Sequence, residues 1–135
     1  MIVHWHDQIT AGSVSDHICA FWDVLPTLGE ISGYSYKKTD GISFFPTLKG
    51  NRQEVHEYLY WELPEGKGSK AIRMGKWKGY LSNIKNGNRC VELYDLETDP
   101  QEQYNLSSIY PNVVKEIEKK MKKAHTESPV TNYKL

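Results

Sequence analysis

The sequence predicts an α+β fold in which a four-stranded antiparallel sheet is packed by one C-terminal helix. The main observation is a series of four short aromatic or β-branched segments separated by turn residues. A second observation is one long amphipathic segment that follows them. The third is size and composition, because 135 residues with 39% hydrophobic and 25% charged content are typical of a single globular domain.

The first third of the chain predicts one strand and one helix. Residues 1–3 are apolar and partly β-branched, which favours a strand. Residues 23–32 have helix signals at both ends, with Asp23 as N-cap, Pro26 in the first turn and Gly33 as the C-terminal glycine. We expect one face of this helix to be buried, formed by Leu25, Leu28 and Ile31.

Four strands are predicted in the middle of the chain, at residues 56–61, 71–74, 77–81 and 91–94. Gly75 and Lys76 stand between the second and third, and glycine in the first position favours a two-residue type II′ hairpin turn. The residues Asn86-Gly87-Asn88 indicate the next reversal. Consecutive reversals of this kind predict an antiparallel meander.

A last helix is predicted to begin at Pro111, a residue favoured at the first helical position. Apolar residues recur every three or four positions and would face the sheet; they are Val113, Val114, Ile117, Met121 and Ala124. Lysines gather near the helix end, where the helix dipole favours them. We interpret this basic run as a solvated helix face in preference to a phosphate or sulfate patch. Residues 126–135 are predicted to form a flexible tail.

Charge and hydropathy exclude several classes of partner. The 17 basic and 17 acidic residues balance, so no basic footprint for nucleic acid stands out. No run of about 18 apolar residues is present, and no membrane span is predicted. The first six residues lack the basic and apolar regions of a signal peptide.

Motifs for metal binding are incomplete in this sequence. His4 and His6 alternate on one strand face and could offer two imidazoles, but no motif supplies a third ligand. Residues 95–99 resemble the start of a calcium loop, yet Pro100 occupies the place that needs glycine and the closing glutamate is missing. We therefore predict no metal site.

Motifs for a catalytic nucleophile are also missing. Cys19 and Cys90 have no motif around them, and the sequence alone leaves open whether they pair. Asp16 and His17 are neighbours, so on a strand they would point to opposite faces. No glycine-rich phosphate loop or dinucleotide fingerprint is present. From the residues alone the chain is an α+β domain without a visible active site.

Several segments, taken in order, resemble the C-terminal portion of the sulfatase family. Residues 2–14 are similar to the family's "IVRWPGKIKPGSV", with His4 in place of arginine and His6 in place of proline. The other matching segments are "DVLPTL" at 23–28, "DGISFFPTLKG" at 40–50, "YLYWE" at 58–62, "AIRMGKWK" at 71–78 and "ELYDLETDPQEQYNL" at 92–106.

The resemblance implies a division of the chain and a function. Residues 1–50 would be the terminal edge of the large sulfatase α/β domain, with an edge strand and a helix. Residues 51–125 would be the C-terminal subdomain, and 126–135 the tail. The chain would be a fragment of an enzyme that hydrolyses sulfate esters, forming part of the cleft wall and inactive alone.

The chemistry of the family is implied to lie elsewhere. Full-length sulfatases use a formylglycine made from C/S-x-P-x-R and a calcium ion, and neither that motif nor the acidic ligands are found here. No catalytic or metal-binding residue is therefore carried over. His56 and Glu57, at the start of a predicted strand, are our candidates for contact with substrate.

The resemblance also implies partners and a compartment. The expected partners are the N-terminal catalytic domain and, for the intact enzyme, a sulfate-ester substrate. The face that docks on that domain would be exposed in this chain and could support self-association. Full-length relatives are expected in the periplasm, outside the cell or in lysosomes.

Two other hypotheses stay open at this point. The chain could be a stand-alone, non-catalytic binding or scaffold module, in which Tyr58, Tyr60 and Trp61 form a stacking platform for sulfated glycans. The same residues could instead be cross-strand core pairs. The chain could also be one part of a split enzyme that a second polypeptide completes.

Overall fold

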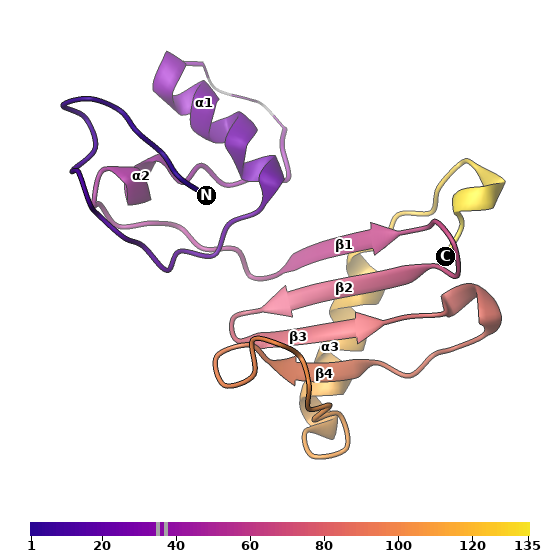
Figure 1. The fold of residues 1–135 in the computed structure, drawn as a ribbon. Coiled ribbons are helices and arrows are strands. Elements are labelled where there is room, and N and C mark those ends of the chain that lie inside the picture. The colour runs from indigo at the N-terminus through magenta and orange to yellow at the C-terminus, as the bar shows by residue number, and fades with distance from the viewer. Residues whose placement is uncertain (35, 37) are drawn as a thin grey trace. The chain divides into compact units, whose positions relative to one another are not determined.

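The protein divides into two compact units, Met1–His56 and Glu57–Leu135. The structure, a computed structural model, describes residues 1–34, 36 and 38–135 (Figure 1). The first unit contains helix α1 (Val24–Ser32), which continues a 3-10 helix at Phe21–Asp23, and the short helix α2 (Phe45–Leu48). The second unit contains the sheet and the long C-terminal helix.

The predicted strand at residues 1–3 is wrong. These residues have no regular secondary structure, and the first 20 residues contain no helix or strand. A strand needs a neighbour to accept and donate its ladder hydrogen bonds, and the first unit offers none among its described residues. Ile2 is 98% exposed, so its apolar side chain is left in solvent.

Helix α1 confirms the predicted C-terminus but corrects the predicted burial. Gly33 has a positive φ of 75°, and its amide donates to the carbonyl of Glu30. Asp23 occupies the predicted N-cap position, but its side chain makes no capping hydrogen bond to the helix. Leu25 and Leu28, expected in the core, are 49% and 57% exposed. The buried residues of the helix are instead Thr27 and Gly29.

The predicted four-stranded antiparallel meander is confirmed, with strand order β1-β2-β3-β4. Its strands are β1 (Leu59–Leu63), β2 (Ser69–Met74), β3 (Trp77–Leu81) and β4 (Glu92–Asp95). Gly75 has a φ of 55° in the two-residue turn between β2 and β3, as the hairpin prediction requires.

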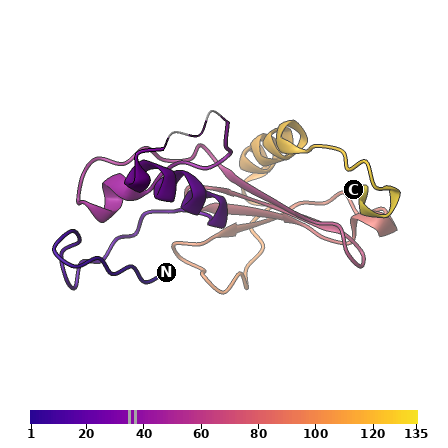
Figure 2. The same ribbon diagram turned by 90° about the horizontal axis from the view of Figure 1, so that it is seen from above.

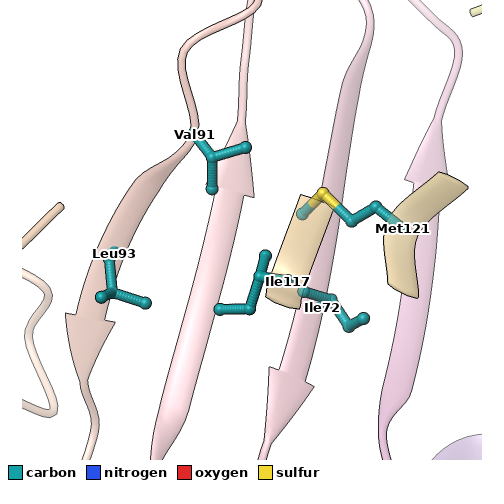
Figure 3. Close-up of a cluster of buried hydrophobic side chains, with 5 residues drawn as sticks. All are labelled: Ile72, Val91, Leu93, Ile117 and Met121. Carbon is teal, nitrogen blue, oxygen red and sulfur yellow. The ribbon is translucent and has the colours of Figure 1, made fainter. Parts of the chain in front are cut away.

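Helix α3 (Pro111–Ala124) lies across one face of the sheet (Figures 1 and 2). The predicted apolar stripe is confirmed at Ile117 and Met121, which are buried against the strands. Figure 3 shows the cluster where helix and sheet meet, formed by Ile72, Val91, Leu93, Ile117 and Met121. No described helix has both the length and the apolar character needed to span a membrane.

Gly79 allows this close packing of helix and sheet. A Cβ added at Gly79 would lie 2.5 Å from Cγ2 of Ile117 and 3.2 Å from Cγ2 of Ile72. The register places Gly79 between Ile72 on β2 and Leu93 on β4, in the centre of the covered face. A side chain at this position would therefore push α3 away from the sheet.

Candidate functional site

His56, one of the two predicted substrate contacts, is bound to a buried carboxylate. Its Nε2 lies 2.8 Å from Oδ1 of Asp23, whose side chain is fully buried. The same Oδ1 accepts a hydrogen bond from the amide of Ile42 at 2.9 Å, and Oδ2 accepts one from the amide of Ala20 at 2.6 Å. Asp23 therefore joins three segments of the first unit, with His56 as its side-chain partner.

Glu57, the other predicted contact, is paired with the C-terminal helix. Lys120 of α3 donates a hydrogen bond to Glu57, and its ammonium also lies 5.4 Å from the ring centre of Tyr58. The hydrogen bond and the charge of Lys120 lower the pKa of Glu57, and the same hydrogen bond raises the pKa of Lys120. Glu57 is exposed, so this pair is open to solvent.

A polar cluster links β1 to the end of α3, formed by Tyr60, Glu62, Lys70 and His125. The carboxylate of Glu62 accepts a hydrogen bond from the hydroxyl of Tyr60, and Nδ1 of His125 lies 2.6 Å from it. Nζ of Lys70, directly across from Glu62 in the sheet, lies 3.2 Å from the same Nδ1. Because Nδ1 has a carboxylate and an ammonium as neighbours, its proton decides which contact is a hydrogen bond.

The electrostatics of this cluster favour an ionised Glu62. Burial raises the pKa of Glu62, but the hydrogen bonds from Tyr60 and His125 and the charge of Lys70 outweigh it, and the net pKa is lowered. Burial, together with the neighbouring Glu62, raises the pKa of Tyr60. Glu62 is therefore a carboxylate and Tyr60 a neutral phenol at neutral pH.

The segment "ELYDLETDPQEQYNL" has structural partners for its polar side chains. Nζ of Lys76 lies 2.6 Å from Asp95, and this hydrogen bond lowers the pKa of Asp95. Asp99 accepts a hydrogen bond from the amide of Tyr104 at 2.8 Å. These carboxylates are occupied by a lysine and by backbone amides, so they stabilise the turn after β4.

Asn105, in the same segment, covers the outer edge of β4. Its Oδ1 accepts hydrogen bonds from the amides of Leu93 at 3.1 Å and Ser107 at 3.0 Å. The amide of Leu106 donates to the carbonyl of Leu93 at 2.8 Å. The side chain and the backbone of this segment together satisfy an edge strand that would otherwise expose unpaired groups.

The strand geometry contradicts the hypothesis that Tyr58, Tyr60 and Trp61 form one stacking platform. Tyr58 and Tyr60 pack against the core cluster under α3. Trp61 is the next residue along β1, and neighbouring residues of a strand point to opposite faces. The three aromatic rings therefore do not form one surface.

The remaining candidates from the sequence are not brought together. Cys19 and Cys90 are both free thiols. His6 has Asp7 as its partner, 3.2 Å away on the surface. Within the described residues, no three His, Cys, Asp or Glu side chains are grouped so that they could hold a metal ion. These residues do not fit the calcium ion that the family resemblance implies.

Neither the contact of Asp23 with His56 nor that of Glu62 with His125 can be seen in the sequence, because their members are far apart along the chain. Asp23 and His56 are separated by 33 residues, and Glu62 and His125 by 63. The one local signal was the alternation of Tyr60 and Glu62, which places their side chains on one strand face. Their other partners depend on strand register and on where α3 ends.

Several known proteins that are similar to this chain are sulfatases. The family model described as "N-sulphoglucosamine sulphohydrolase, C-terminal" matches residues 1–127. The ulvan-active sulfatase of Formosa agariphila is 31% identical over 141 residues, which cover 79% of this chain and 28% of that protein. Human arylsulfatase A is 26% identical over 158 residues, covering 96% of this chain and 31% of that protein.

A solved structure has the same fold. The crystal structure of Ps i-CgsB in complex with k-i-k-neocarrahexaose aligns with a TM-score of 0.75 and 24% identity, covering 89% of this chain and 27% of that one. The chain thus spans less than a third of the length of each of these three proteins. The α+β class and the resemblance to the C-terminal part of sulfatases are confirmed. Because the family model matches nearly the whole chain, the protein belongs to the N-sulphoglucosamine sulphohydrolase C-terminal family.

Proposed function

We propose that this chain is the non-catalytic C-terminal part of an enzyme that hydrolyses sulfate esters, and that it forms part of the wall of the substrate cleft. The observation that carries the proposal is the family match over residues 1–127 in a sequence without a C/S-x-P-x-R motif. In this proposal residues 1–50 belong to the edge of the large α/β domain, 51–125 form the C-terminal subdomain and 126–135 the tail.

The catalytic groups would come from the N-terminal domain. Formylglycine would supply the nucleophile and calcium would stabilise charge on the sulfate oxygens. The described residues of this chain offer no such metal ligands. Its own contribution would be to position the cleft wall and to cover apolar surface of the partner domain.

The exposed apolar residues of the first unit support docking on such a domain. Leu25 and Leu28 are neighbours on one side of α1 and are both exposed, and Phe21 is 90% exposed. Exposed apolar side chains that cluster in this way mark interaction surfaces. The partner that fits is the rest of a sulfatase, because this chain covers only 28% and 31% of the two relatives described above.

His56 and Glu57 remain our candidates for contact with the substrate of the intact enzyme. Glu57 is exposed, and a substrate hydroxyl could exchange with Lys120 as its partner. Alanine at Glu57, or at His56, should raise KM in that enzyme, with alanine at the exposed residue Glu54 as control. An unchanged KM for both the Glu57 and the His56 variants would show that these residues have structural roles alone.

Two measurements test the proposed function. The purified 135-residue chain, supplied with calcium, should not hydrolyse an aryl sulfate. The gene should continue upstream of Met1 in frame and encode C/S-x-P-x-R. Turnover by the chain alone would refute the non-catalytic role. A true start at Met1 would refute the fragment and favour a stand-alone binding module or a split enzyme.

A further inference from the structure

A cavity of about 300 Å³ lies in the second unit, between the last turns of α3 and the sheet. Its apolar lining consists of Leu81, Val91 and Met121, the last two of which are buried. This lining is continuous with the core cluster, since Val91 and Met121 belong to both. None of the lining residues lies in the segments of the sequence that were quoted as similar to sulfatases.

The rest of the lining is mainly basic. It consists of Lys70, Arg89, Lys122 and His125, together with Glu118. Glu62 is outside the lining, and its carboxylate lies 3.8 Å from Nζ of Lys70. The lining therefore holds three permanent cations and one carboxylate, and a second carboxylate is close to one of the cations.

The basic side chains are held in different ways. Nη1 of Arg89 donates hydrogen bonds to the carbonyls of Ile84 at 3.0 Å and Asn88 at 2.7 Å, which fixes the guanidinium at the cavity. Lys70 is held by its contact with His125. The side chain of Lys122 makes no hydrogen bond or ion pair with another residue in the described part of the chain. Its charge is available to a ligand.

We propose that this cavity binds a small organic anion with one ring-sized apolar body and one sulfonate, sulfate or carboxylate group. The volume is at the lower end of the range of about 300–1,000 Å³ for small-molecule sites, which limits the ligand to about one ring. The apolar body would cover Leu81, Val91 and Met121. The acidic group would accept hydrogen bonds from Arg89 and Lys122. This inference does not depend on the proposed function.

Toluene-4-sulfonate is a suitable probe, because it has one ring, one permanent charge and no sulfate ester to hydrolyse. It should be titrated into the intact chain while backbone amide shifts are followed by NMR. We expect shifts at Val91, Leu81 and residues 118–125. Toluene-4-sulfonamide, the neutral analogue, should bind at least about tenfold more weakly, and inorganic sulfate, which lacks the ring, should also bind weakly.

Charge-removing variants locate the site. Arg89→Gln with Lys122→Gln should raise the Kd for the sulfonate about tenfold. Lys122→Gln alone should raise it about threefold, and it cannot disturb the contacts that Arg89 makes with the backbone. The matched control is Lys115→Gln with Lys119→Gln, which removes the same charge from exposed positions of α3 outside the cavity lining.

The results of these titrations would either support or overturn the proposed anion site in the cavity. Sulfonate binding that Lys122→Gln weakens and the control leaves unchanged would support it. Equal binding of the neutral analogue would overturn the anion site. An equal loss in the control variant would show attraction by overall charge. Shifts confined to the first unit, or no shifts at all, would overturn the proposal.

Discussion

The side chain of Asp23 connects separate segments of the first unit. Its buried carboxylate accepts hydrogen bonds from two backbone amides and lies next to the imidazole of His56. A buried carboxylate that loses a partner keeps the cost of its desolvation without the compensating hydrogen bond. Neighbouring Thr27 extends this arrangement, since its hydroxyl donates to the carbonyl of Asp23 and accepts from the amide of Phe44. The first unit, poor in regular structure, is thus connected through side-chain to backbone hydrogen bonds.

His56→Ala should therefore lower the free energy of unfolding of the first unit by about 1 to 3 kcal/mol. The expected change follows from the loss of the imidazole next to a fully buried Asp23. Urea unfolding of the intact chain, monitored by amide signals of residues 20–25 and 41–44, would measure it. The control is His6→Ala, which removes an imidazole from an exposed pair and should have an effect below about 0.5 kcal/mol. Equal stabilities of the two variants would contradict this role.

Glu62 should contribute a pH-dependent part of the stability of the second unit. Its pKa is lowered in the folded state from the ordinary value of 4.5, so the unfolded chain binds the proton more tightly. The contribution is therefore complete above about pH 5 and is lost as pH falls below 4.5 through the lowered folded value. Denaturation midpoints measured at pH 7 and pH 3 should show this loss.

Glu62→Gln removes the titrating group and keeps its shape. The difference in midpoint between pH 7 and pH 3 should be smaller in this variant than in the natural sequence, although Asp95 and Glu57, whose pKa values are also lowered, preserve part of it. Gln101→Glu, at an exposed position, is a control in which the difference should not shrink. An unchanged difference in Glu62→Gln would show that the cluster does not contribute.

The contact of α3 with the sheet depends on a strand position without a side chain. Gly79→Ala places a methyl group against Ile117, and overpacking of this kind costs about 1 to 3 kcal/mol. Thermal or chemical unfolding of the second unit would measure the change. In Gly79→Ala with Ile117→Ala the loss should be less than the sum of the two single losses, because the smaller helix residue makes room. Additive losses would contradict a direct clash.

Asn105 should protect the outer edge of the sheet. Asn105→Ala leaves the amides of Leu93 and Ser107 without their acceptor and should cost about 1 kcal/mol. Hydrogen exchange gives a local measurement, in which the amide of Leu93 should exchange faster while that of Ile72, in the middle of the sheet, changes little. Gln103→Ala, at an exposed position of the same segment, should leave the Leu93 amide unchanged.

At the scale of the whole molecule, the main feature is that many large apolar side chains of the first unit are exposed. They are Met1, Ile2, Val3, Trp5, Val14, Phe21, Leu25, Leu28, Tyr34, Tyr36 and Val55. Such a surface tends to associate when its natural partner is absent. The surface supports the proposal that the rest of a sulfatase covers this unit.

Leu25→Glu with Leu28→Glu should therefore reduce self-association of the isolated chain. Both side chains are largely exposed, so the free energy of unfolding should change by less than about 0.5 kcal/mol. Size-exclusion chromatography with light scattering at several concentrations would measure the associated fraction. Gln101→Glu with Gln103→Glu adds the same charge to exposed polar positions of the second unit and should leave association unchanged.

The two units differ in how far the sequence predicts them. In the second unit, periodicity and turn residues predicted four strands in order, the Gly75 hairpin and the stripe through Ile117 and Met121. These features depend on neighbours within a few residues, which a local pattern records. In the first unit the same reasoning placed Leu25 and Leu28 in a core and residues 1–3 in a strand. An apolar residue indicates what can be buried, whereas its burial depends on which segments pack against it in the folded chain.

The family, the fold class and the lack of a sulfatase nucleophile motif can all be read from the order of residues, because motifs and periodicity are properties of neighbouring positions. The more distant partners of Asp23 and Glu62 cannot be read in this way. Asp23 is joined to residues 42 and 56 by the folding of the first unit, and Glu62 meets Lys70 through strand register and His125 at the end of α3. The burial and the charge interactions of these side chains therefore depend on the tertiary structure, which brings residues that are far apart in the sequence close together in space.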